Sequence, residues 1–340
     1  MTQCALLYSL CRRGGTRLHL RPCGTMSSVC GSICGCSVLF CFDCKFVSIE
    51  LLKRVHFNVD DDNATTVKEE INEILTSLEF KKASCAVGIN SPIIFTESIK
   101  IPKLSFNEEN KACMLKLEKT YKDDFDKQYV FVKDKINVNK NTRRVNYLLV
   151  QKDKYKKLLN KIEFFGLNID KVVFNPVALA QFVGKKHIIS GDKTGLYINI
   201  DKTNAIIVVT KGAHLVDYKI TNLGLYPIYD CIAKFQKRDP NEVVSNPFGE
   251  NSPEVEIMVK EYFQSVINDV KKISYLNDFT INELYLHSEF GLNDFIKAQF
   301  EKRLKLQFKA NVKLNDTISE CFQAFSVLKC NLQTLPVRMK

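Results

Sequence analysis

The order of the predicted elements most constrains the fold of this chain, because that order is repeated. One strand hairpin is predicted at 38–52 and a second at 196–209. After each hairpin, apolar stripes at helical spacing alternate with short runs of β-branched and aromatic residues. A hairpin followed by alternating helices and strands, present twice, predicts two related α/β halves around a cleft. The length of 340 residues is sufficient for two such halves.

Start and stop signals place individual elements within this order. Ser105-Phe-Asn-Glu108 is a capping box, which predicts a helix to about Tyr121. Asn175-Pro176 supplies an N-cap and a first-turn proline, and Pro253 opens the longest predicted helix. Further strands are predicted at 84–89, 93–101, 128–138, 145–151, 171–174, 214–220, 284–287 and 306–312, with helices near 67–78, 154–165, 226–236 and 292–304.

The first 37 residues differ in composition from the rest. They contain four Arg but no Lys, Asn, Asp or Glu, and eight of the 13 Cys lie before residue 45. Three interpretations are open: a transit or signal segment, a poor membrane span over the uncharged stretch 22–42, or an extension that is unstructured or not part of the functional protein. Cys41-x-x-Cys44, with Cys34 and Cys36 nearby, has zinc-ligand spacing but no matching downstream pair.

The formal net charge of +11 suggests two kinds of partner, nucleic acid and an anionic membrane surface. Lys and acidic residues are interspersed from residue 68 onward, so most of this charge is expected to be a solvated surface. A basic cluster with interleaved aromatic residues is formed by Lys133, Lys135, Lys140, Arg143 and Arg144 with Tyr129, Phe131 and Tyr147. Such a combination can bind single-stranded nucleic acid, but a solvated turn or a face near anionic lipid headgroups is favoured.

Several classes of enzyme lack their motifs in this sequence. It contains no Gly-x-x-x-x-Gly-Lys-Ser/Thr loop, no His-Glu-x-x-His pair and no Ser or Cys in a nucleophile elbow. The five histidines are isolated from one another, so a structural role is expected for them. The dispersed cysteines after residue 45 are typical of reduced, buried side chains rather than of a disulfide framework.

The run from Ser84 to Pro102, SCAVGINSPIIFTESIKIP, resembles the start of the small inserted subdomain of PilM proteins. These are the actin-like cytoplasmic components of type IV pilus assembly and are related to the division protein FtsA. The elements predicted at 106–121, 128–150 and 154–165 follow the order of that subdomain. GLNIDKVVFNPVALA at 166–180 is similar to the family's return to the large domain, and 196–209 falls at its second phosphate-binding hairpin. The resemblance covers residues 38–330 in the order and spacing of elements.

The resemblance implies an α/β fold of two actin- or RNase H-like halves around a cleft, with a small inserted α+β subdomain of the SHS2 type. The first half would comprise 38–83 and 166–192, the inserted subdomain 84–165 and the second half 193–340. Residues 1–37 would be an atypical Cys- and Arg-rich extension.

The phosphate-binding turns depart from the family's pattern. In an actin-like nucleotidase each turn carries Asp-x-Gly, whose carboxylate holds a hydrated Mg²⁺ while the glycine lets backbone N–H groups approach phosphate. The first turn here is Asp43-Cys-Lys45, with Lys in place of Gly. The second is Asn199-Ile-Asp201, with Asn in place of Asp and Asp in place of Gly. A neutral amide is a weak Mg²⁺ ligand, and a carboxylate at the glycine position repels the phosphates.

The rest of the implied nucleotide site is altered as well. Lys202 and Thr203, together with Asp201, are an alternative candidate for the phosphate-binding loop. The turn on the adenosine side, which is Gly-Gly in the family, reads Ser288-Glu-Phe-Gly291. Gly224 remains where the family has a glycine pair. The resemblance therefore implies a degenerate site at Asp43, Lys45, Asn199, Asp201, Lys202, Thr203, Gly224, Ser288, Glu289 and Gly291, with Asp43 and Asp201 as Mg²⁺ ligands only if ATP binds.

These altered loops predict a pseudo-nucleotidase, for which ATP and Mg²⁺ are candidate ligands only. By resemblance, the chain would be a cytoplasmic scaffold of a type IV pilus or related type II secretion complex, at the inner face of the inner membrane. Its partner would be the cytoplasmic tail of a PilN-like membrane protein, held between the sheet of 38–100 and the helices at 106–121 and 154–165. Other pilus proteins or a second copy are further expected partners, and nucleic acid is not. The alternative is an active Mg-ATP-binding ATPase of pilus assembly.

Overall fold

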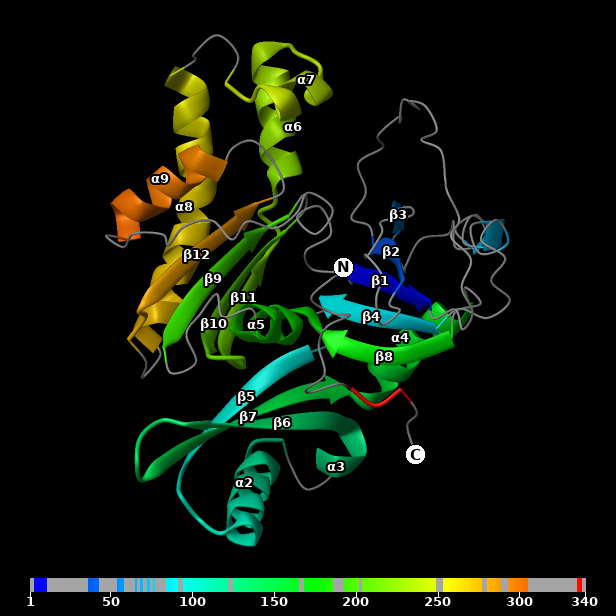
Figure 1. The fold of residues 1–340 in the computed structure, drawn as a ribbon, viewed down its shortest axis with the longest axis vertical. Helices are drawn as coiled ribbons and strands as arrows, with labels where there is room; N and C mark the ends of the chain where they lie inside the picture. The colour runs from blue at the N-terminus through cyan, green and yellow to red at the C-terminus, as the bar shows by residue number, and fades with distance from the viewer. Residues whose placement is uncertain are drawn as a thin grey trace.

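The computed structural model describes residues 3–10, 36–42, 54–57, 84–90, 94–121, 125–164, 168–185, 193–201, 204–248, 253–276, 280–288, 293–304 and 335–337, with isolated helical positions between 65 and 76. In this part of the chain the strands form three sheets (Figure 1). Their strand orders are β3-β2-β1-β4-β8, β11-β10-β9-β12 and β5-β7-β6.

The five-stranded sheet belongs to the first half. Its strands are β1 (Gln3–Leu10), β2 (Cys36–Phe42), β3 (Arg54–Phe57), β4 (Ser84–Asn90) and β8 (Asn168–Phe174). β4 runs parallel to β8 and antiparallel to β1, while β1 is parallel to β2 and β2 is antiparallel to β3. β4 contains a continuous buried run, Ala86–Ile89, which is typical of a strand covered on both faces.

The first half differs from the sequence-based prediction at its beginning. Residues 1–37 were expected to stand apart from the fold, but β1 lies inside the five-stranded sheet. The physical reason is its sequence, QCALLYSL, an uncharged run with enough apolar and aromatic residues to pair as an internal strand. The predicted strand at 46–52, the turn at 43–45 and the cysteines between 11 and 35 lie outside the described residues.

The small subdomain contains three antiparallel strands and three helices. These are β5 (Ile94–Pro102), α2 (Phe106–Tyr121), α3 (Phe125–Gln128), β6 (Tyr129–Asn137), β7 (Thr142–Gln151) and α4 (Lys152–Phe164). The capping box is confirmed, because the Ser105 N–H donates to Glu108 Oε2 at 3.1 Å and α2 begins at the next residue. α2 packs on one face of the sheet over a core that includes Cys113, Leu117 and Leu149.

The boundary of the small subdomain also differs from the prediction. The strands at 84–89 and 93–101 were both assigned to it, as a pair. In the structure β4 pairs with β1 and β8, whereas β5 pairs along its whole length with β7. The subdomain therefore begins at β5, because the apolar run of β4 is completed by the large sheet.

The second half contains the four-stranded sheet. Its elements are β9 (Thr194–Ile200), β10 (Ala205–Lys211), β11 (His214–Thr221), α6 (Leu225–Gln236), α7 (Pro240–Ser245), α8 (Pro253–Leu276), β12 (Glu283–Ser288) and α9 (Asn293–Leu304). The predicted three-strand meander and the long helix from Pro253 are confirmed. Alternate residues Leu196, Ile198 and Ile200 of β9 share one core with α6 and α8. The predicted strand at 306–312 lies outside the described residues.

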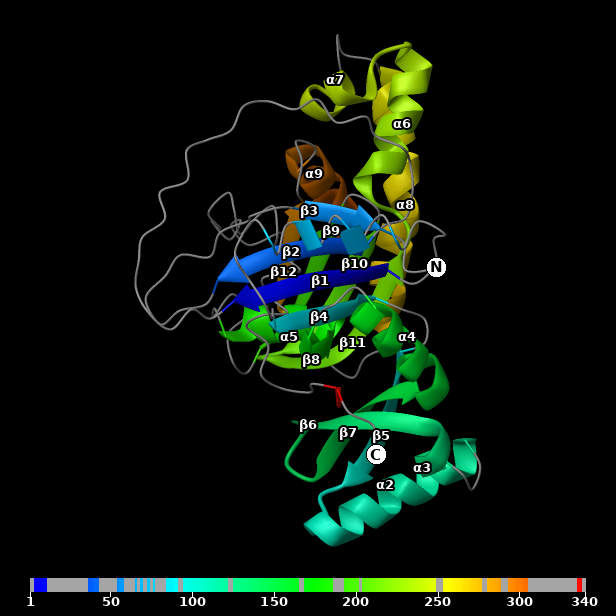
Figure 2. The same ribbon diagram turned by 90° about the vertical axis from the view of Figure 1, so that its right-hand side faces the viewer.

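One helix joins the two halves. α5 (Asn175–Lys185) contacts β4 and β8 of the first sheet and β10 and β11 of the second (Figure 1). Its residues 177–183 are all buried, as expected for a helix between two sheets. The small subdomain forms one end of the molecule, and α6, α7 and the start of α8 form the other (Figure 2). These are the two α/β halves expected from the repeated order of elements.

Candidate functional site

The β9–β10 turn and the start of α6 meet at one edge of the four-stranded sheet. The Asp201 N–H donates to the Asn204 carbonyl at 2.8 Å, which closes a tight turn. The N–H of Leu225, the first residue of α6, donates to the Asp201 carbonyl at 3.0 Å. Gly224, the buried N-cap of α6, offers its carbonyl to the Tyr262 hydroxyl at 2.8 Å. The N-terminus of α6 is therefore fixed against the turn.

Four of the ten residues predicted for the nucleotide site are brought together at this edge. Ser288, the last residue of β12, lies beside Ile200 in register, and Asn199, Asp201 and Gly224 lie on or against the same turn. The other six, Asp43, Lys45, Lys202, Thr203, Glu289 and Gly291, lie outside the described residues. The structure thus brings together the four predicted residues that it describes, and their role in nucleotide binding stays a prediction.

Asn199 decides what this edge can bind. It is 3% exposed and lies on the face of the sheet opposite the α6–α8 core, which is the face turned to α5. Its Oδ1 has no hydrogen-bond partner among the described residues.

Among the described residues at this edge, Asn199 is not a typical ligand of a Mg²⁺–nucleotide complex. Mg²⁺ in proteins prefers carboxylate and phosphate oxygens, and Asn199 offers a neutral amide. Among the described residues, no group of three His, Cys, Asp or Glu side chains is placed to hold a metal ion. The partial positive charge at the N-terminus of α6 favours an anion. Asp201, however, brings a carboxylate to the same turn.

A second candidate site lies between the small subdomain and the second half. A pocket of about 200 Å³ is bounded by the small sheet, α5 and β11. Its lining includes Thr96, Ser98, Arg144, Asn146, Val177 and Asp217. Polar and apolar side chains are thus mixed around a concave space.

Hydrogen bonds across this pocket hold the small sheet to β11. The Asn146 side-chain amide donates to the Leu215 carbonyl at 2.7 Å, and Arg144 Nη2 donates to the Val216 carbonyl at 3.2 Å. The Ser98 hydroxyl donates to Asn146 Oδ1 at 2.8 Å. Arg144 was predicted as part of a basic surface, but it is 8% exposed and forms this junction.

The outer edge of β5 runs beside the pocket. The carbonyl of Ile94 accepts from the Tyr218 hydroxyl at 3.4 Å and that of Lys100 from Lys116 Nζ at 3.2 Å, so both carbonyls point away from β7. Because alternate residues of a strand direct their backbone groups to the same side, those of Thr96 and Ser98 point outward too. No strand among the described residues pairs with this edge.

Sequence reasoning missed this pocket, although a signal for it was present. Alternate residues of β5 and β7 belong to the core under α2: Ile99, Ile101, Val145, Tyr147 and Leu149. The polar residues between them, Ser98, Arg144 and Asn146, therefore share the opposite face of the sheet. Polar residues at every second position of two paired strands indicate that the other face of the sheet is polar. Another part of the molecule can cover that face.

No protein-family model and no curated relative matches the sequence. Solved structures do. A chain of the PilM–PilN type IV pilus biogenesis complex is 12% identical, with a TM-score of 0.61 over 82% of this chain and 89% of that one. A protein with an actin-like ATPase fold from Bacteroides thetaiotaomicron is 12% identical, with a TM-score of 0.43 over 84% of this chain and 88% of its own. An archaeal actin homologue is 14% identical, with a TM-score of 0.37 over 47% of this chain and 54% of its own.

The similarity to the chain of the PilM–PilN complex, with a TM-score of 0.61, confirms the expected fold. It extends over 82% of this chain and 89% of that one, so it is not limited to one half. No helix in the described ranges is long and apolar enough to cross a membrane. This chain has the actin-like ATPase fold, in the arrangement found in the PilM–PilN complex.

Proposed function

We propose that this chain is a scaffold of a type IV pilus or a related secretion complex and that it binds the cytoplasmic tail of a PilN-like membrane protein. The observation that supports this proposal is the structural similarity to a chain of the PilM–PilN complex over 82% of this chain. The proposed binding locates the chain at the inner face of the membrane through its partner.

The tail is proposed to bind along the outer edge of β5. The sequence-based location, between the sheet of 38–100 and two helices, does not match the structure, since β4 and β5 belong to different sheets and α2 covers the opposite face of the small sheet. The outward backbone groups of Thr96 and Ser98 can pair with an extended peptide, whose side chain can then enter the adjacent pocket.

Titration of the full chain with a synthetic tail peptide tests this proposal. Thr96→Pro removes one outward N–H group and leaves the pairing of β5 with β7 intact. Thr96→Val is the matched control, because it removes the hydroxyl and keeps the N–H group. We expect at least tenfold weaker binding for the proline variant and wild-type binding for the valine variant. Equal affinity of both variants, at unchanged melting temperature, would reject the β5 edge.

We further propose that ATP hydrolysis is impaired. The observation behind this is the neutral Asn199 at the position where the family carries Asp. In a thermal-shift assay, a ligand at a hundredfold excess over Kd stabilises the folded state by about 2.7 kcal/mol. We expect no such stabilisation of the wild type by Mg-ATP, and a measurable one for Asn199→Asp.

An active ATPase is the second candidate function, favoured by the meeting of the β9–β10 turn, the α6 N-terminus and the end of β12 at one edge. Mg-dependent phosphate release by the wild-type chain that is abolished in Asp201→Ala would establish it. That result would leave the peptide titration to decide the scaffold role separately.

A further inference from the structure

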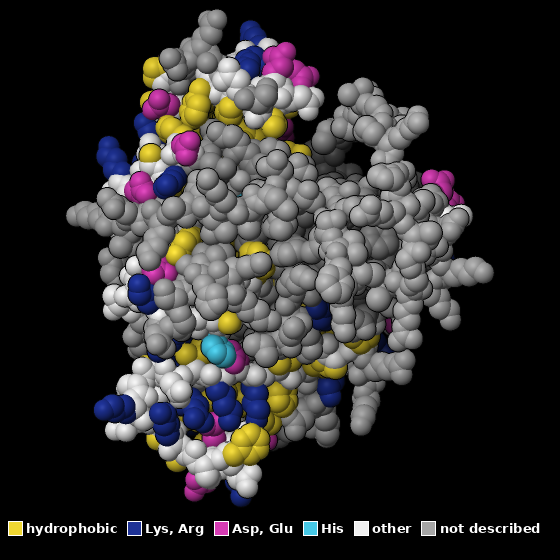
Figure 3. Space-filling view, viewed as in Figure 1, with side chains coloured by type: hydrophobic (Ala, Val, Ile, Leu, Met, Phe, Trp, Pro, Cys, Tyr) yellow, Lys and Arg dark blue, Asp and Glu magenta, His cyan; other side chains and the backbone are white. Residues whose placement is uncertain are grey.

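Positive charge is concentrated in the small subdomain. Residues 94–164 contain 17 Lys and Arg against 10 Asp and Glu, a net +7 of the chain's +11. Figure 3 shows Lys and Arg side chains gathered in a row over this end of the molecule, with hydrophobic side chains beside them. An uneven distribution of this kind produces a local positive potential that attracts anionic partners.

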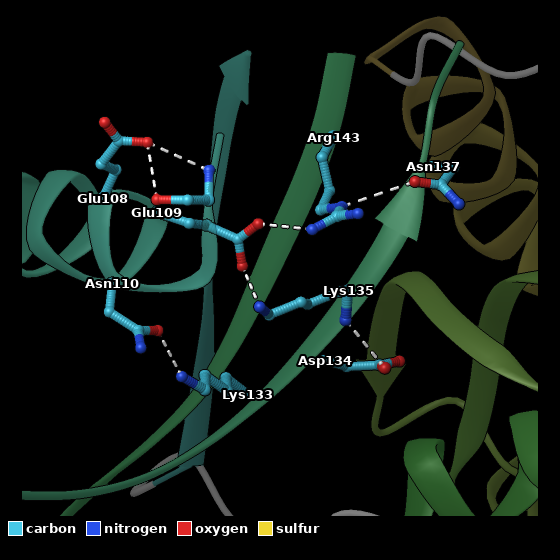
Figure 4. Close-up of polar contacts among 9 residues, drawn as sticks. Glu108, Glu109, Asn110, Lys133, Asp134, Lys135, Asn137 and Arg143 are labelled. Atoms are coloured by element: carbon cyan, nitrogen blue, oxygen red, sulfur yellow. Dashed lines mark hydrogen bonds and ion pairs between the residues drawn. The ribbon is translucent and has the colours of Figure 1, made fainter. Parts of the chain in front are cut away.

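The first turn of α2 holds three of these cations in place. Glu109, 1% exposed, forms ion pairs with Lys135 and with Arg143, the latter at 2.6 Å from Nη1 to Oε2 (Figure 4). Asn110 Oδ1 accepts from Lys133 Nζ at 2.6 Å. Lys135 and Arg143 remain 28% and 27% exposed, so one buried carboxylate orients two cations that still reach the surface.

These side chains, with Lys140 at the exposed β6–β7 turn, form a surface that we name the cationic face: Lys133, Lys135, Lys140 and Arg143. Among the described residues, Glu109 is the carboxylate that forms ion pairs with this face. Because Asn110 is neutral, its hydrogen bond with Lys133 does not compensate the charge of this lysine. The cationic face therefore keeps a net positive charge.

An exposed aromatic ring lies directly beside these cations. Phe106 is 64% exposed, although the ammonium groups of Lys133 and Lys135 lie 5.2 and 4.8 Å from its ring centroid. Leu104, just before α2, is 37% exposed. Cations flanking exposed apolar side chains are the combination that binds at a membrane surface, where phosphates pair with the cations and the apolar groups enter the headgroup boundary.

Two other anionic partners fit this surface less well. Single-stranded nucleic acid needs several exposed aromatic faces on which successive bases stack, but Tyr147 is 2% exposed and Phe131 packs against it beneath α2, so of these three rings Phe106 alone is open to a base. An acidic peptide needs a groove or an open strand edge. The pocket and the open edge of β5 carry Thr96 and Ser98, which belong to the other face of the small sheet.

We propose that the cationic face, together with Phe106, binds the anionic headgroups of a phospholipid bilayer. The contact shares no residue with the β5 edge proposed for the tail, so the two contacts are compatible. It also does not depend on the tail, because vesicles alone present the required chemistry.

Cosedimentation of the full chain with vesicles tests the proposal. We expect binding to vesicles of equal parts phosphatidylglycerol and phosphatidylcholine, and none to phosphatidylcholine alone. Each basic residue near an anionic surface changes the binding constant by about fivefold, so the double variant Lys133→Gln/Lys140→Gln is expected to bind about 25-fold more weakly. These two lysines are chosen because neither pairs with buried Glu109, so its ion pairs with Lys135 and Arg143 are kept. Phe106→Ser is expected to weaken binding as well.

The matched control is Lys234→Gln/Lys271→Gln, which removes the same charge from exposed positions on α6 and α8. An equal loss in the control would show that net charge alone attracts the chain and would overturn the proposal. Absence of binding to anionic vesicles would overturn it too, as would binding of an oligonucleotide or polyglutamate through the same lysines without vesicle binding. Wild-type binding by Phe106→Ser would overturn the part assigned to the ring.

Discussion

Glu109→Gln is the substitution that most directly tests the electrostatics of the small subdomain. The carboxylate is buried between α2 and the strands β6 and β7, where Lys135 and Arg143 are its partners. Glutamine keeps the shape of the side chain and one acceptor oxygen but loses the charge. Both cations are then left without their counter-ion at a site where water reaches them only in part.

The expected loss of stability follows from the exposure of the three groups. Removing one partner of a fully buried ion pair lowers the free energy of unfolding by about 3–5 kcal/mol, whereas exposed ion pairs contribute about 0–1 kcal/mol to it. Glu109 is buried, but Lys135 and Arg143 are 28% and 27% exposed and recover part of their hydration. We therefore expect a loss of about 2 kcal/mol, between the two limits.

The loss is expected to depend on pH in a defined direction. Burial works to raise the pKa of Glu109, but the hydrogen bonds and charges of Lys135 and Arg143 outweigh it and hold this pKa below its ordinary value of 4.5. A lowered pKa contributes stability that is present above about 4.5 and disappears as the pH falls through the folded-state pKa.

Urea unfolding followed by far-UV circular dichroism, at neutral pH and in steps below pH 4.5, measures this difference. The difference in the free energy of unfolding between wild type and Glu109→Gln should disappear as the pH is lowered. Glu108→Gln is the control, since this exposed neighbour interacts with Ser105 at the start of α2 and touches no cation of the pair. A gap that stays constant with pH, or one no larger than the control's, would refute the ion-pair argument.

Two further predictions concern the β10–β11 turn. Gly184→Ala on α5 should destabilise the fold by about 1–3 kcal/mol, because a Cβ at this position would lie 2.5 Å from the backbone nitrogen of Ala213. Calorimetry of this variant, with Ala180→Gly measured beside it, gives the loss of stability. The hydrogen bond of His214 to Asp134, at 2.8 Å, raises the pKa of His214 against the opposing effect of burial. This contact should stabilise the fold below about pH 6.5 and lose its contribution as the pH rises through the folded-state pKa. Destabilisation by His214→Gln should thus be greater at pH 6 than at pH 9 in urea unfolding, and a loss independent of pH would contradict it.

Elements with strong local signals were predictable from the sequence. The capping box from Ser105 and the proline at 253 fixed the starts of α2 and α8, because helix starts depend on residues a few positions apart. The pairing of β4 and the position of β1 were not predictable in the same way. A short apolar run carries no information about which distant strand completes its hydrogen bonds, and the resemblance includes both 84–89 and 93–101 in the small subdomain.

The candidate site was predictable only where the family resemblance supplied positions. It placed Asn199, Asp201, Gly224 and Ser288 in one site, and the structure brings these four to one edge. The small subdomain shows the limit of sequence reasoning. Arg143 and Arg144 are neighbours in one basic cluster, yet strand alternation sends the first to Glu109 under α2 and the second to the β11 junction.

The position of this junction separates the proposed scaffold role from the proposed nucleotide site. The carbonyls of Leu215 and Val216 accept hydrogen bonds from Asn146 and Arg144, and both residues lie next to the β10–β11 turn. The β9–β10 turn lies at the opposite end of the same strands. The junction uses backbone carbonyls, which any residue supplies, so substitutions at the nucleotide edge leave it unchanged. Tail binding should accordingly be the same in wild type and Asn199→Asp, and a difference between them would show that the two ends of the sheet are coupled.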